Sequence, residues 1–348
     1  MRLKHFRYFV GIAVGLLLHA FSATGQQKQY AVYPLAFYNV ENLFDTQRDT
    51  TVMDFEFTPE GGLNWTPDKY RKKLTRLSTV LSRIGRQHGS AGPALIGVCE
   101  VENRKVLEDL VSQDAVKGMN LQIVHYDSPD RRGIDVALLY NPDLFRFVEA
   151  KVLPYHLPER PDYVTRDILM VKGVIANEMV HVFVNHWPSR FGGKSSILRE
   201  HAASVLRHAV DSIYSARPEA KIVIMGDFND DPVDKSIQEV LQAEGKRERV
   251  ADQGLYNTMY RHYKRGVGSL GYLAKWNLFD QIIISKPLLS NNSGKLQFWK
   301  SEIYNPDYLT TKEGRYKGYP FRTFSSNLFQ DGYSDHFPVL IYLLKELE

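Results

Sequence analysis

The sequence contains a single cysteine, Cys99, among 348 residues. Because a disulfide needs two thiols, no intramolecular disulfide can form, and the fold must rely on its hydrophobic core. Hydrophobic residues make up 43% of the chain and charged residues 24%, which are ordinary values for a globular protein with a packed interior. Cys99 itself lies in the apolar run "ALIGVCEV", where we expect a small buried side chain.

Long hydrophobic runs are also scarce. The most prominent one, near residues 8–21, is about 14 residues long and falls short of the roughly 20 residues that span a bilayer. Basic residues precede it, and the small residues 23–25 follow it. This pattern predicts a secretory signal peptide over residues 1–25, followed by one domain over residues 28–348. We therefore expect an exported protein, periplasmic or extracellular, without a stable membrane span.

The sequence has little excess charge of either sign. Its net charge is +4, and residues 1–25 contribute three basic and no acidic side chains, so the mature chain would carry about +1. Nucleic-acid-binding domains often show a strongly basic face, which this balance does not suggest. Any polyanionic substrate would therefore have to be bound locally. The composition shows no repeat and no low-complexity linker, and we expect a monomer.

Short apolar runs, rich in β-branched residues, predict many strands. Eight such runs stand out: "AVYPLAFYNV", "ALIGVCEV", "LQIVHY", "IDVALLYN", "GVIANEMVHVFVNHW", "KIVIMGDFN", "FDQIIISK" and "FPVLIYLL". Residues 290–331 are rich in Gly, Asn and Tyr, and we interpret them as mostly loop. Many strands with few, well-separated helices indicate stacked sheets with helices outside.

Two helices are clear from the sequence, and a third, shorter one is expected after Pro232. The first begins at Thr66, the N-cap, with Pro67 in the first helical position. The second covers about residues 196–215. Its predicted apolar stripe consists of Ile197, Val205, Ala209 and Ile213.

The stretch "GDFNDD" ends a buried strand with an unusual density of acidic and amide groups. On its own this could be an ordinary turn, because Asp and Asn bond to their own backbone. Several other strand ends carry the same chemistry, however. Together with Asp227 and Asn229 of "GDFNDD", the residues at these ends are Asn39, Glu41, Glu100, Asn185, His186, Asp280, Asp335 and His336. If these strand ends meet at one sheet edge, they form a site of hard oxygen ligands flanked by two histidines, which suits Mg²⁺, Mn²⁺ or Ca²⁺ better than zinc.

The ordered motifs "NVEN", "CE", "NHW", "GDFND", "FDQI" and "SDHFP" resemble those of the endonuclease/exonuclease/phosphatase superfamily, the deoxyribonuclease-I-like proteins. The resemblance extends from Asn39 to His336 and covers nearly the whole mature chain. It implies an α/β fold, a four-layered α/β/β/α sandwich in which two mixed sheets pack face to face with helices outside. It also implies a divalent-metal-dependent phosphoric ester hydrolase.

The resemblance assigns a metal role to four residues. Glu100 matches the family's principal metal ligand, and Asn39 and Glu41 match the first motif, which helps to hold the metal. The family often has a different residue at the position of Glu41, so its share is less defined. Asp335 matches a further carboxylate on the metal side.

Five other residues match the catalytic positions of the family. Asp227 and Asn229 match the pair beside the scissile phosphate, and His336 matches the essential histidine. Asp280 matches the acid that pairs with that histidine, and His186 matches a second phosphate-binding histidine. Asp227 is suited to orient or deprotonate water, but the sequence leaves open whether Asp227 or a histidine is the base.

Evidence for the substrate is weaker in the sequence. Arg132, in a loop before a strand, and Arg190, shortly after His186, are candidate phosphate-binding residues, because guanidinium groups bind phosphate well. The alternative interpretation is that both arginines are solvated charges on loops and do not bind the substrate. Residues 256–276 interleave aromatic and basic side chains, which fits either nucleic-acid stacking or an exposed hairpin with one packed face.

Three functions are consistent with these features of the sequence. The favoured one is a secreted phosphodiesterase, most simply a nuclease or nucleotide-scavenging enzyme. The second is a sphingomyelinase-like enzyme that cleaves a lipid head group. The third is a catalytically inactive surface binding protein on the same fold, although every catalytic position that we could match is filled. A phosphomonoesterase is a minor further option.

Overall fold

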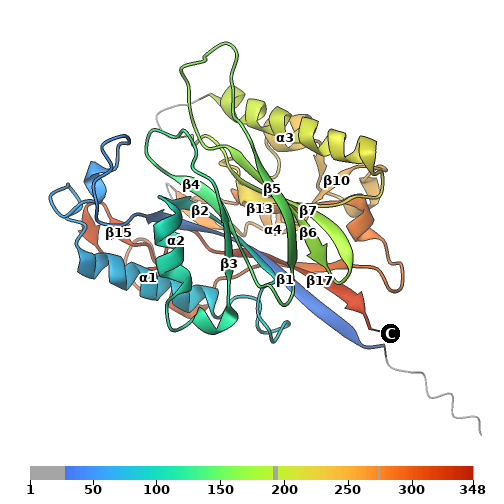
Figure 1. The fold of residues 1–348 in the computed structure, drawn as a ribbon, viewed down its shortest axis with the longest axis horizontal. Helices are drawn as coiled ribbons and strands as arrows, with labels where there is room; N and C mark the ends of the chain where they lie inside the picture. Colours follow the sequence, from blue (N-terminus) through green and yellow to red (C-terminus); the bar gives the residue numbers. More distant parts are fainter. Residues whose placement is uncertain (1–27, 191–194, 273–274, 348) are drawn as a thin grey trace, which may run out of the picture.

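The computed structural model describes residues 28–190, 195–272 and 275–347 (Figure 1). The predicted signal peptide lies outside these residues. Within them, no helix is both long enough and apolar enough to cross a membrane. Two large sheets stack in the centre of the molecule, and the described chain ends lie close together, where Leu347 donates its backbone N–H to Gln29.

The first sheet has six strands and contains both ends of the domain. In spatial order the strands are β14 (Gln297–Ile303), β17 (Val339–Glu346), β1 (Tyr30–Leu43), β2 (Leu95–Val101), β4 (Asp135–Tyr140) and β3 (Gln122–His125). The β1–β2 pair is parallel and the other pairs are antiparallel. The sheet is therefore mixed, as predicted.

The second sheet has seven strands. In spatial order they are β5 (Arg146–Leu153), β6 (Ile168–Ile175), β7 (Glu178–His186), β8 (Lys221–Asp227), β13 (Asp280–Ser285), β10 (Leu255–Asn257) and β9 (Ala243–Glu244). The β7–β8 and β9–β10 pairs are parallel, so this sheet is mixed too. Two small hairpins stand apart: β11 (Leu270–Tyr272) with β12 (Lys275–Asn277), and β15 (Phe324–Ser325) with β16 (Leu328–Phe329).

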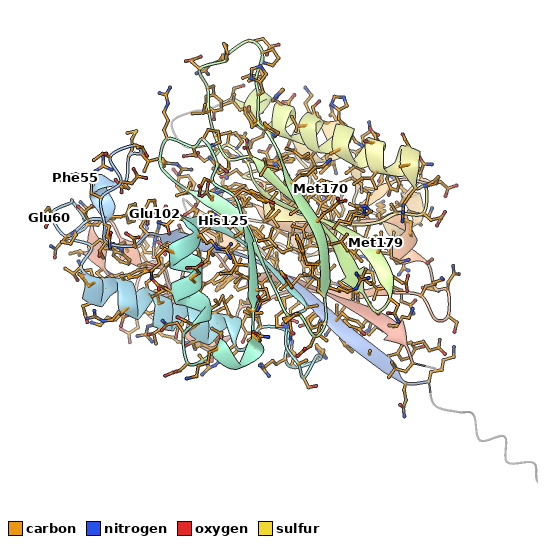
Figure 2. All side chains as sticks on the ribbon, in the orientation of Figure 1. Phe55, Glu60, Glu102, His125, Met170 and Met179 are labelled. Carbon is orange, nitrogen blue, oxygen red and sulfur yellow. The ribbon has the colours of Figure 1, made fainter. Side chains whose placement is uncertain are left out.

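Helices cover the two outer faces. Figure 1 shows α1 (Pro67–Leu81) and α2 (Arg104–Val111) on one side and α3 (Ser196–Ala216) on the other. The side chains of β8 alternate accordingly: Val223 and Met225 belong to the main core, whereas Ile222 and Ile224 pack in the cluster under α3. Side chains fill the space between the layers (Figure 2). The predicted four-layered sandwich is confirmed.

An ion-pair cluster ties the two sheets together at the edge opposite the strand ends discussed below. Glu178 on β7 accepts hydrogen bonds from Lys221 on β8 at 2.6 Å and from Lys345 on β17 at 2.8 Å. It also accepts the backbone N–H of Leu296. All three charged side chains are largely buried, so their interaction is screened less than that of a surface pair.

The first helix agrees with its prediction. Thr66 caps α1 by accepting the backbone N–H of Lys69, and Pro67 is the first helical residue. The second helix has the predicted extent but a different buried face. Ile197 is 64% exposed, because the stripe that packs on the sheet is rotated by one residue. That stripe comprises Leu198, Ala202, Leu206, Val210 and Tyr214.

Several other expectations were incomplete. Residues 290–331 are not all loop, since β14 lies within them and forms an edge of the first sheet. The run "GVIANEMVHVFVNHW" is the end of β6 and all of β7, joined by a turn in which Ala176 and Asn177 have positive φ. The segment after Pro232 forms a single π-helical turn, residues 236–240. Residues 256–276 contain the short helix α4 (Tyr260–Lys264) and the β11–β12 hairpin.

The topology brings the chemistry-bearing strand ends to one edge. Strands β1, β2, β7 and β8 have their carboxyl ends there, whereas β13 and β17 run antiparallel to their neighbours and begin there. In the second sheet Asp227 is paired with both His186 and Asp280. In the first sheet Asn39 is paired with Cys99, the residue before Glu100.

Candidate active site

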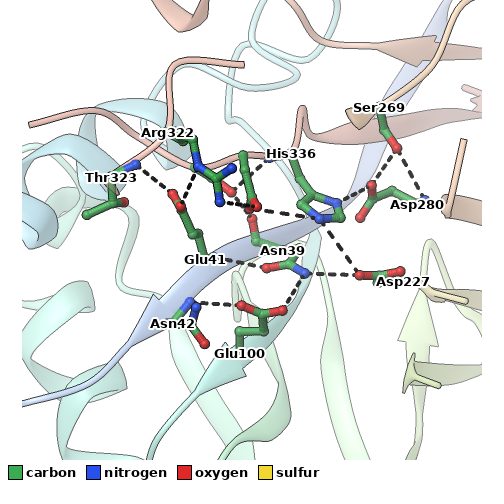
Figure 3. A network of polar contacts seen from close by, with 12 residues as sticks. Asn39, Glu41, Asn42, Glu100, Asp227, Ser269, Asp280, Arg322, Thr323 and His336 are labelled. Carbon is green, nitrogen blue, oxygen red and sulfur yellow. Dashed lines mark hydrogen bonds and ion pairs between the residues drawn. The ribbon is translucent and has the colours of Figure 1, made fainter. Parts of the chain in front are cut away.

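A single amide links the two sheets at this edge. The side-chain Nδ2 of Asn39 donates to Glu100 Oε1 at 3.1 Å and to Asp227 Oδ2 at 3.0 Å (Figure 3). Its Oδ1 accepts the backbone N–H of Glu41 at 2.9 Å, so the partners on both sides fix the amide orientation. Asn39 is fully buried. Asn39 therefore positions two carboxylates, Glu100 from the first sheet and Asp227 from the second. Its predicted role in holding a metal stays a prediction.

The local backbone turns Glu100 toward this edge. Glu100 has φ +61°, and Glu41 and Asn42 on the neighbouring strand have φ +52° and +53°. Left-handed backbone is unfavourable for residues other than glycine, and β1 and β2 shift register here. The conformational free energy that this left-handed backbone costs is offset in part by a hydrogen bond, in which the backbone N–H of Asn42 donates to Glu100 Oε2 at 3.0 Å. Such strain is typical of functional sites.

The second pair of residues is Asp280 with His336. His336 Nδ1 lies 2.6 Å from Asp280 Oδ2, and the Ser269 hydroxyl donates to the same oxygen. Burial lowers the pKa of His336, but the charge and hydrogen bond of Asp280, helped by Asp335 and Asp227, raise that pKa well above its usual range. His336 is therefore an imidazolium whose Nε2–H points away from Asp280. Nε2 lies 3.9 Å from Asp227 Oδ2.

The other histidine has the opposite charge state. His186 is fully buried, and burial followed by the charges of Arg166, Arg132 and His336 lowers its pKa well below the ordinary value. It is therefore a neutral imidazole. Its Nε2 lies 3.8 Å from Glu100 Oε1 and 3.9 Å from Asp227 Oδ2. The site thus offers one charged and one neutral ring, both facing Asp227.

The acidic cluster of "GDFNDD" divides into two groups. Asp227 and Asn229 face the site: the backbone N–H of Asn229 donates to Asp227 Oδ1 at 2.9 Å, which leaves Oδ2 toward the histidines. Asp230 pairs instead with Arg199 at 2.7 Å, and Asp231 accepts the backbone N–H of Leu278 at 2.7 Å. Asp230 and Asp231 therefore stabilise the surrounding fold, whereas Asp227 and Asn229 face the site.

Glu41 and Asp335 lie beside this centre and share a guanidinium. Arg322 donates from Nε to Glu41 at 3.3 Å (Figure 3). It also donates from an Nη atom to Asp335 at 2.9 Å. Glu41 also accepts the backbone N–H of Thr323 and lies 4.0 Å from the buried ammonium of Lys73. Burial, then the Asp335 charge, raise the pKa of Glu41 to about 7. Arg322 and Lys73 balance only part of this negative charge, and the predicted metal roles of Glu41 and Asp335 stay predictions.

The remaining charges fit a divalent cation. Glu100 and Asp227 lie together, and the described residues place no lysine or arginine in an ion pair with either. Burial, as the largest cause, raises the pKa of Asp227 to about 7, which marks a carboxylate with too little positive charge around it. The donor atoms are hard oxygens from Glu100 and Asp227. The adjacent Cys99 is a buried thiol, and burial, as the largest cause, raises its pKa well above the ordinary value.

The two arginines that the sequence proposed for substrate binding are both engaged within the protein. Arg190 forms ion pairs with Asp230 at 2.8 Å and with Asp234. Arg132 lies beside Asp130, with 47% of its side chain exposed. The structure places Arg132 close enough to depress the pKa of His186, whereas Arg190 supports the loop that carries Asn229.

Sequence reasoning missed three residues that shape the site. Arg166 is buried, pairs with Asp130 and donates to the carbonyl of Trp187 at 2.6 Å. Lys73 could have been suspected, because it interrupts the buried stripe of α1 with a charge. Arg322 gave no signal, since it lies in a segment without periodicity.

Comparison with known proteins identifies the family. A family model described as "Endonuclease/Exonuclease/phosphatase family" matches residues 34–345. The chain belongs to the endonuclease/exonuclease/phosphatase family. A comparison with curated protein sequences finds no significant match.

Solved structures show the same fold at low sequence identity. An endonuclease/exonuclease/phosphatase family protein from Bacteroides thetaiotaomicron has TM-score 0.55 at 15% identity, with 92% of this chain and 100% of that chain covered. Mannosyl-6-phosphatase from the same organism has TM-score 0.55 at 14% identity, covering 89% and 99%. D. rerio TDP2 complexed with single-strand DNA product has TM-score 0.54 at 11% identity, covering 90% and 98%.

Membership of the endonuclease/exonuclease/phosphatase family makes this protein a metal-dependent phosphoric ester hydrolase. The geometry agrees with that chemistry. Two carboxylates, an imidazolium and a neutral imidazole converge at one edge of the paired sheets.

Proposed function

We propose that this protein is an exported phosphodiesterase that hydrolyses a nucleic acid or nucleotide substrate by in-line attack of water. The observation that carries the reaction type is Asp227 Oδ2, which lies 3.9 Å from Nε2 of each histidine and 3.0 Å from the amide of Asn39. A phosphate group placed among these side chains meets two N–H donors on one side. A carboxylate that can accept a proton lies beside them.

In this proposal Asp227 is the general base. His336 is already protonated, so it has no free nitrogen to accept a proton. Asp227 Oδ2 faces the space between the two histidines, where an attacking water could donate its proton to it. The water oxygen forms a bond to phosphorus as its proton passes to Asp227. The opposite P–O bond breaks, and the leaving alkoxide takes up a proton from solvent.

His336, His186 and Asn229 bind the phosphate. The imidazolium of His336 donates from Nε2 and stabilises the negative charge that accumulates on the phosphoryl oxygens. His186, as a neutral imidazole, donates a second hydrogen bond. Asn229 already donates one amide hydrogen to the carbonyl of Trp187 at 3.0 Å, which orients the group and leaves its second hydrogen for the phosphate.

A divalent cation completes the site. Glu100 would hold it, with Asp227 contributing charge, and Asn39 would keep the two carboxylates apart and oriented. When bound, such a cation neutralises the phosphate oxygens and stabilises the leaving oxyanion. Mg²⁺ or Mn²⁺ suits these oxygen ligands, and Ca²⁺ is an alternative to be tested.

Support for nucleic acid is the polar, aromatic surface near the site and the single-strand DNA product in the solved TDP2 complex. A sugar phosphomonoester is the second candidate substrate, because a mannosyl-6-phosphatase is among the similar solved structures. A lipid head group is a further alternative, because Met53 is 72% and Phe55 55% exposed in the segment before α1. An inactive binding protein would not need the paired Asp280 and His336.

Export rests on the sequence of residues 1–25 alone. We propose that this segment directs secretion and is removed near residues 25–26. Mass spectrometry of the mature protein from the native cell envelope and medium tests it. A chain that begins near residue 26 is expected, whereas an uncleaved chain retained in the cytosol would refute export.

The reaction is tested with the mature chain, residues 26–348, on supercoiled plasmid, single-stranded RNA, mannose 6-phosphate and sphingomyelin vesicles. Each substrate is incubated with Mg²⁺, Mn²⁺, Ca²⁺ or EDTA. Metal-dependent nicking or RNA cleavage is expected. Cleavage of mannose 6-phosphate alone or of vesicles alone would replace the proposed substrate, and no hydrolysis by folded protein would refute the proposal.

A further inference from the structure

A cleft of about 590 Å³ adjoins the catalytic edge and is not used by the mechanism above. Arg322 and Asp335 line its end nearest the site, and Asp335 Oδ1 lies 3.9 Å from His336 Nε2. Most of the remaining lining comes from residues 311–321 and from β11. The cleft is larger than a phosphate needs, so it has room for a group attached to the phosphate.

One wall of the cleft is a fixed aromatic ring. Tyr319 packs against Trp276 with ring centroids 4.8 Å apart, and Trp276 stacks on Phe337 at 6.1 Å with an interplanar angle of 21°. Phe337 directly follows His336. The backbone of Gly271 lies so close to the Tyr319 ring that an added Cβ would come within 2.3 Å of it. These contacts fix the position of the Tyr319 ring, and they connect it through Trp276 and Phe337 to the segment that carries His336.

Two further tyrosines border the cleft with their rings largely in solvent. Tyr272 is 60% exposed and Tyr316 is 52% exposed. The guanidinium of Arg315 lies 5.8 Å from the Tyr316 ring centroid, and the Tyr316 and Tyr319 centroids are 6.1 Å apart. Three tyrosines and an arginine therefore surround one space, an arrangement suited to a flat, polarisable ring.

The cleft joins the catalytic edge at Arg322, so a ligand bound in the cleft can be continuous with the phosphate. Arg322 has half of its side chain exposed while it bridges Glu41 and Asp335. Its guanidinium therefore lies where the catalytic edge and the cleft meet. A nucleotide whose phosphate is at His336 would extend past Arg322 toward the tyrosines.

We propose that this cleft is a subsite for one nucleobase next to the scissile phosphate, formed by Tyr272, Tyr316 and Tyr319. The inference rests on the proposed function, since it specifies which part of a nucleic acid substrate is recognised. It predicts that the enzyme requires a base on one side of the cleaved bond. Stacking tolerates any base, so little sequence preference is expected.

The test compares a thymidine dinucleotide with two analogues that lack the base on the 5′ or the 3′ side of the phosphodiester. Wild-type enzyme is expected to lose roughly 5- to 150-fold in kcat/KM on one analogue and little on the other. Tyr316→Ala and Tyr272→Ala should lower kcat/KM for the full dinucleotide, chiefly through KM, and reduce this discrimination. Tyr316→Phe should retain it.

Tyr30→Ala is the matched control, because Tyr30 is an exposed tyrosine at the far end of β1. Equilibrium binding of thymidine 5′-monophosphate and deoxyribose 5-phosphate gives a readout independent of turnover. The nucleotide should bind more tightly to wild type, and the Tyr316→Ala variant should lose that preference.

The outcomes separate the two proposals. Equal cleavage of the dinucleotide and both analogues would overturn the base subsite while leaving the phosphodiesterase intact. Loss of mannose 6-phosphate hydrolysis in the tyrosine variants, with no effect of the base, would make the cleft a sugar subsite instead. No phosphodiester cleavage at all would overturn the proposed function and the base subsite with it.

Discussion

Replacing Asp280 by asparagine tests whether His336 works as a cation. The substitution keeps the size of the side chain and an oxygen that can accept the Nδ1–H, but it removes the negative charge. With charge centres about 4 Å apart and an effective dielectric constant near 20, the lost attraction is about 4 kcal/mol. That corresponds to about three pKa units on His336. The observed contact is 2.6 Å and Asp280 is fully buried, so solvent cannot replace it.

We expect Asp280→Asn to lower kcat by roughly 10- to 1,000-fold near neutral pH, because the lower pKa increases the share of enzyme with neutral His336 and the ring loses the charge that orients it. The assay is metal-dependent hydrolysis from pH 5 to 9, together with NMR titration of labelled histidine. Ser269→Ala is the graded control, since it removes a hydrogen bond to Asp280 but keeps the charge; its loss should stay within about tenfold.

Folded Asp280→Asn enzyme with kcat within threefold of wild type would refute this reasoning. A neutral His336 in the wild-type titration at pH 7 would do the same. In either case the histidine could serve as the base, and Asp227 would need another role.

Three further predictions concern stability and metal. Glu178→Gln should destabilise the fold by about 2 kcal/mol near pH 7. Burial acts to raise the folded-state pKa of Glu178, but hydrogen bonds from Lys221 and Lys345 outweigh it, so the pKa is lowered. The loss should therefore shrink as the pH falls below about 4, which denaturant unfolding near pH 7 and below about pH 4 checks. Gly226→Ala would place a Cβ 2.5 Å from the Asn185 carbonyl oxygen, so it should destabilise by about 2 kcal/mol, unlike Gly62→Ala in open space. Mg²⁺ at about 100 times its Kd should stabilise the wild type by about 2.7 kcal/mol over EDTA in thermal unfolding, and Glu100→Ala should abolish that gain.

The sandwich was predictable because its strongest signals are local. The runs that became β1, β2, β8, β13 and β17 are continuous and apolar, and their polar ends could be compared directly in the sequence. Strand β14 was missed because "QFWKSEI" is an edge strand, largely half-buried or exposed, with two charged residues. The extent of helix α3 was predicted correctly, but the predicted buried face lies one residue away from the observed one. Apolar residues occur on both of these adjacent stripes of the helix, so the pattern alone did not distinguish them.

The candidate site was predictable only as far as its strand-end residues. Asp227, Asp280, His336 and Glu100 meet as expected, since strand direction decides which ends share an edge. What the sequence could not show is which charges neutralise each other. Arg322 reaches Glu41 from 281 residues away, and a contact of that kind depends on tertiary packing rather than on local pattern.

The most direct test of the account is plasmid and RNA hydrolysis by residues 26–348 with Mg²⁺, Mn²⁺ or EDTA, beside Glu100→Ala and His336→Ala. Both variants are first shown to be folded by circular dichroism and thermal unfolding. The account predicts metal-dependent cleavage by wild type and at least a 100-fold loss in each variant. Cleavage that persists in EDTA, or that survives in both folded variants, would contradict a metal-assisted reaction at this edge of the sheets.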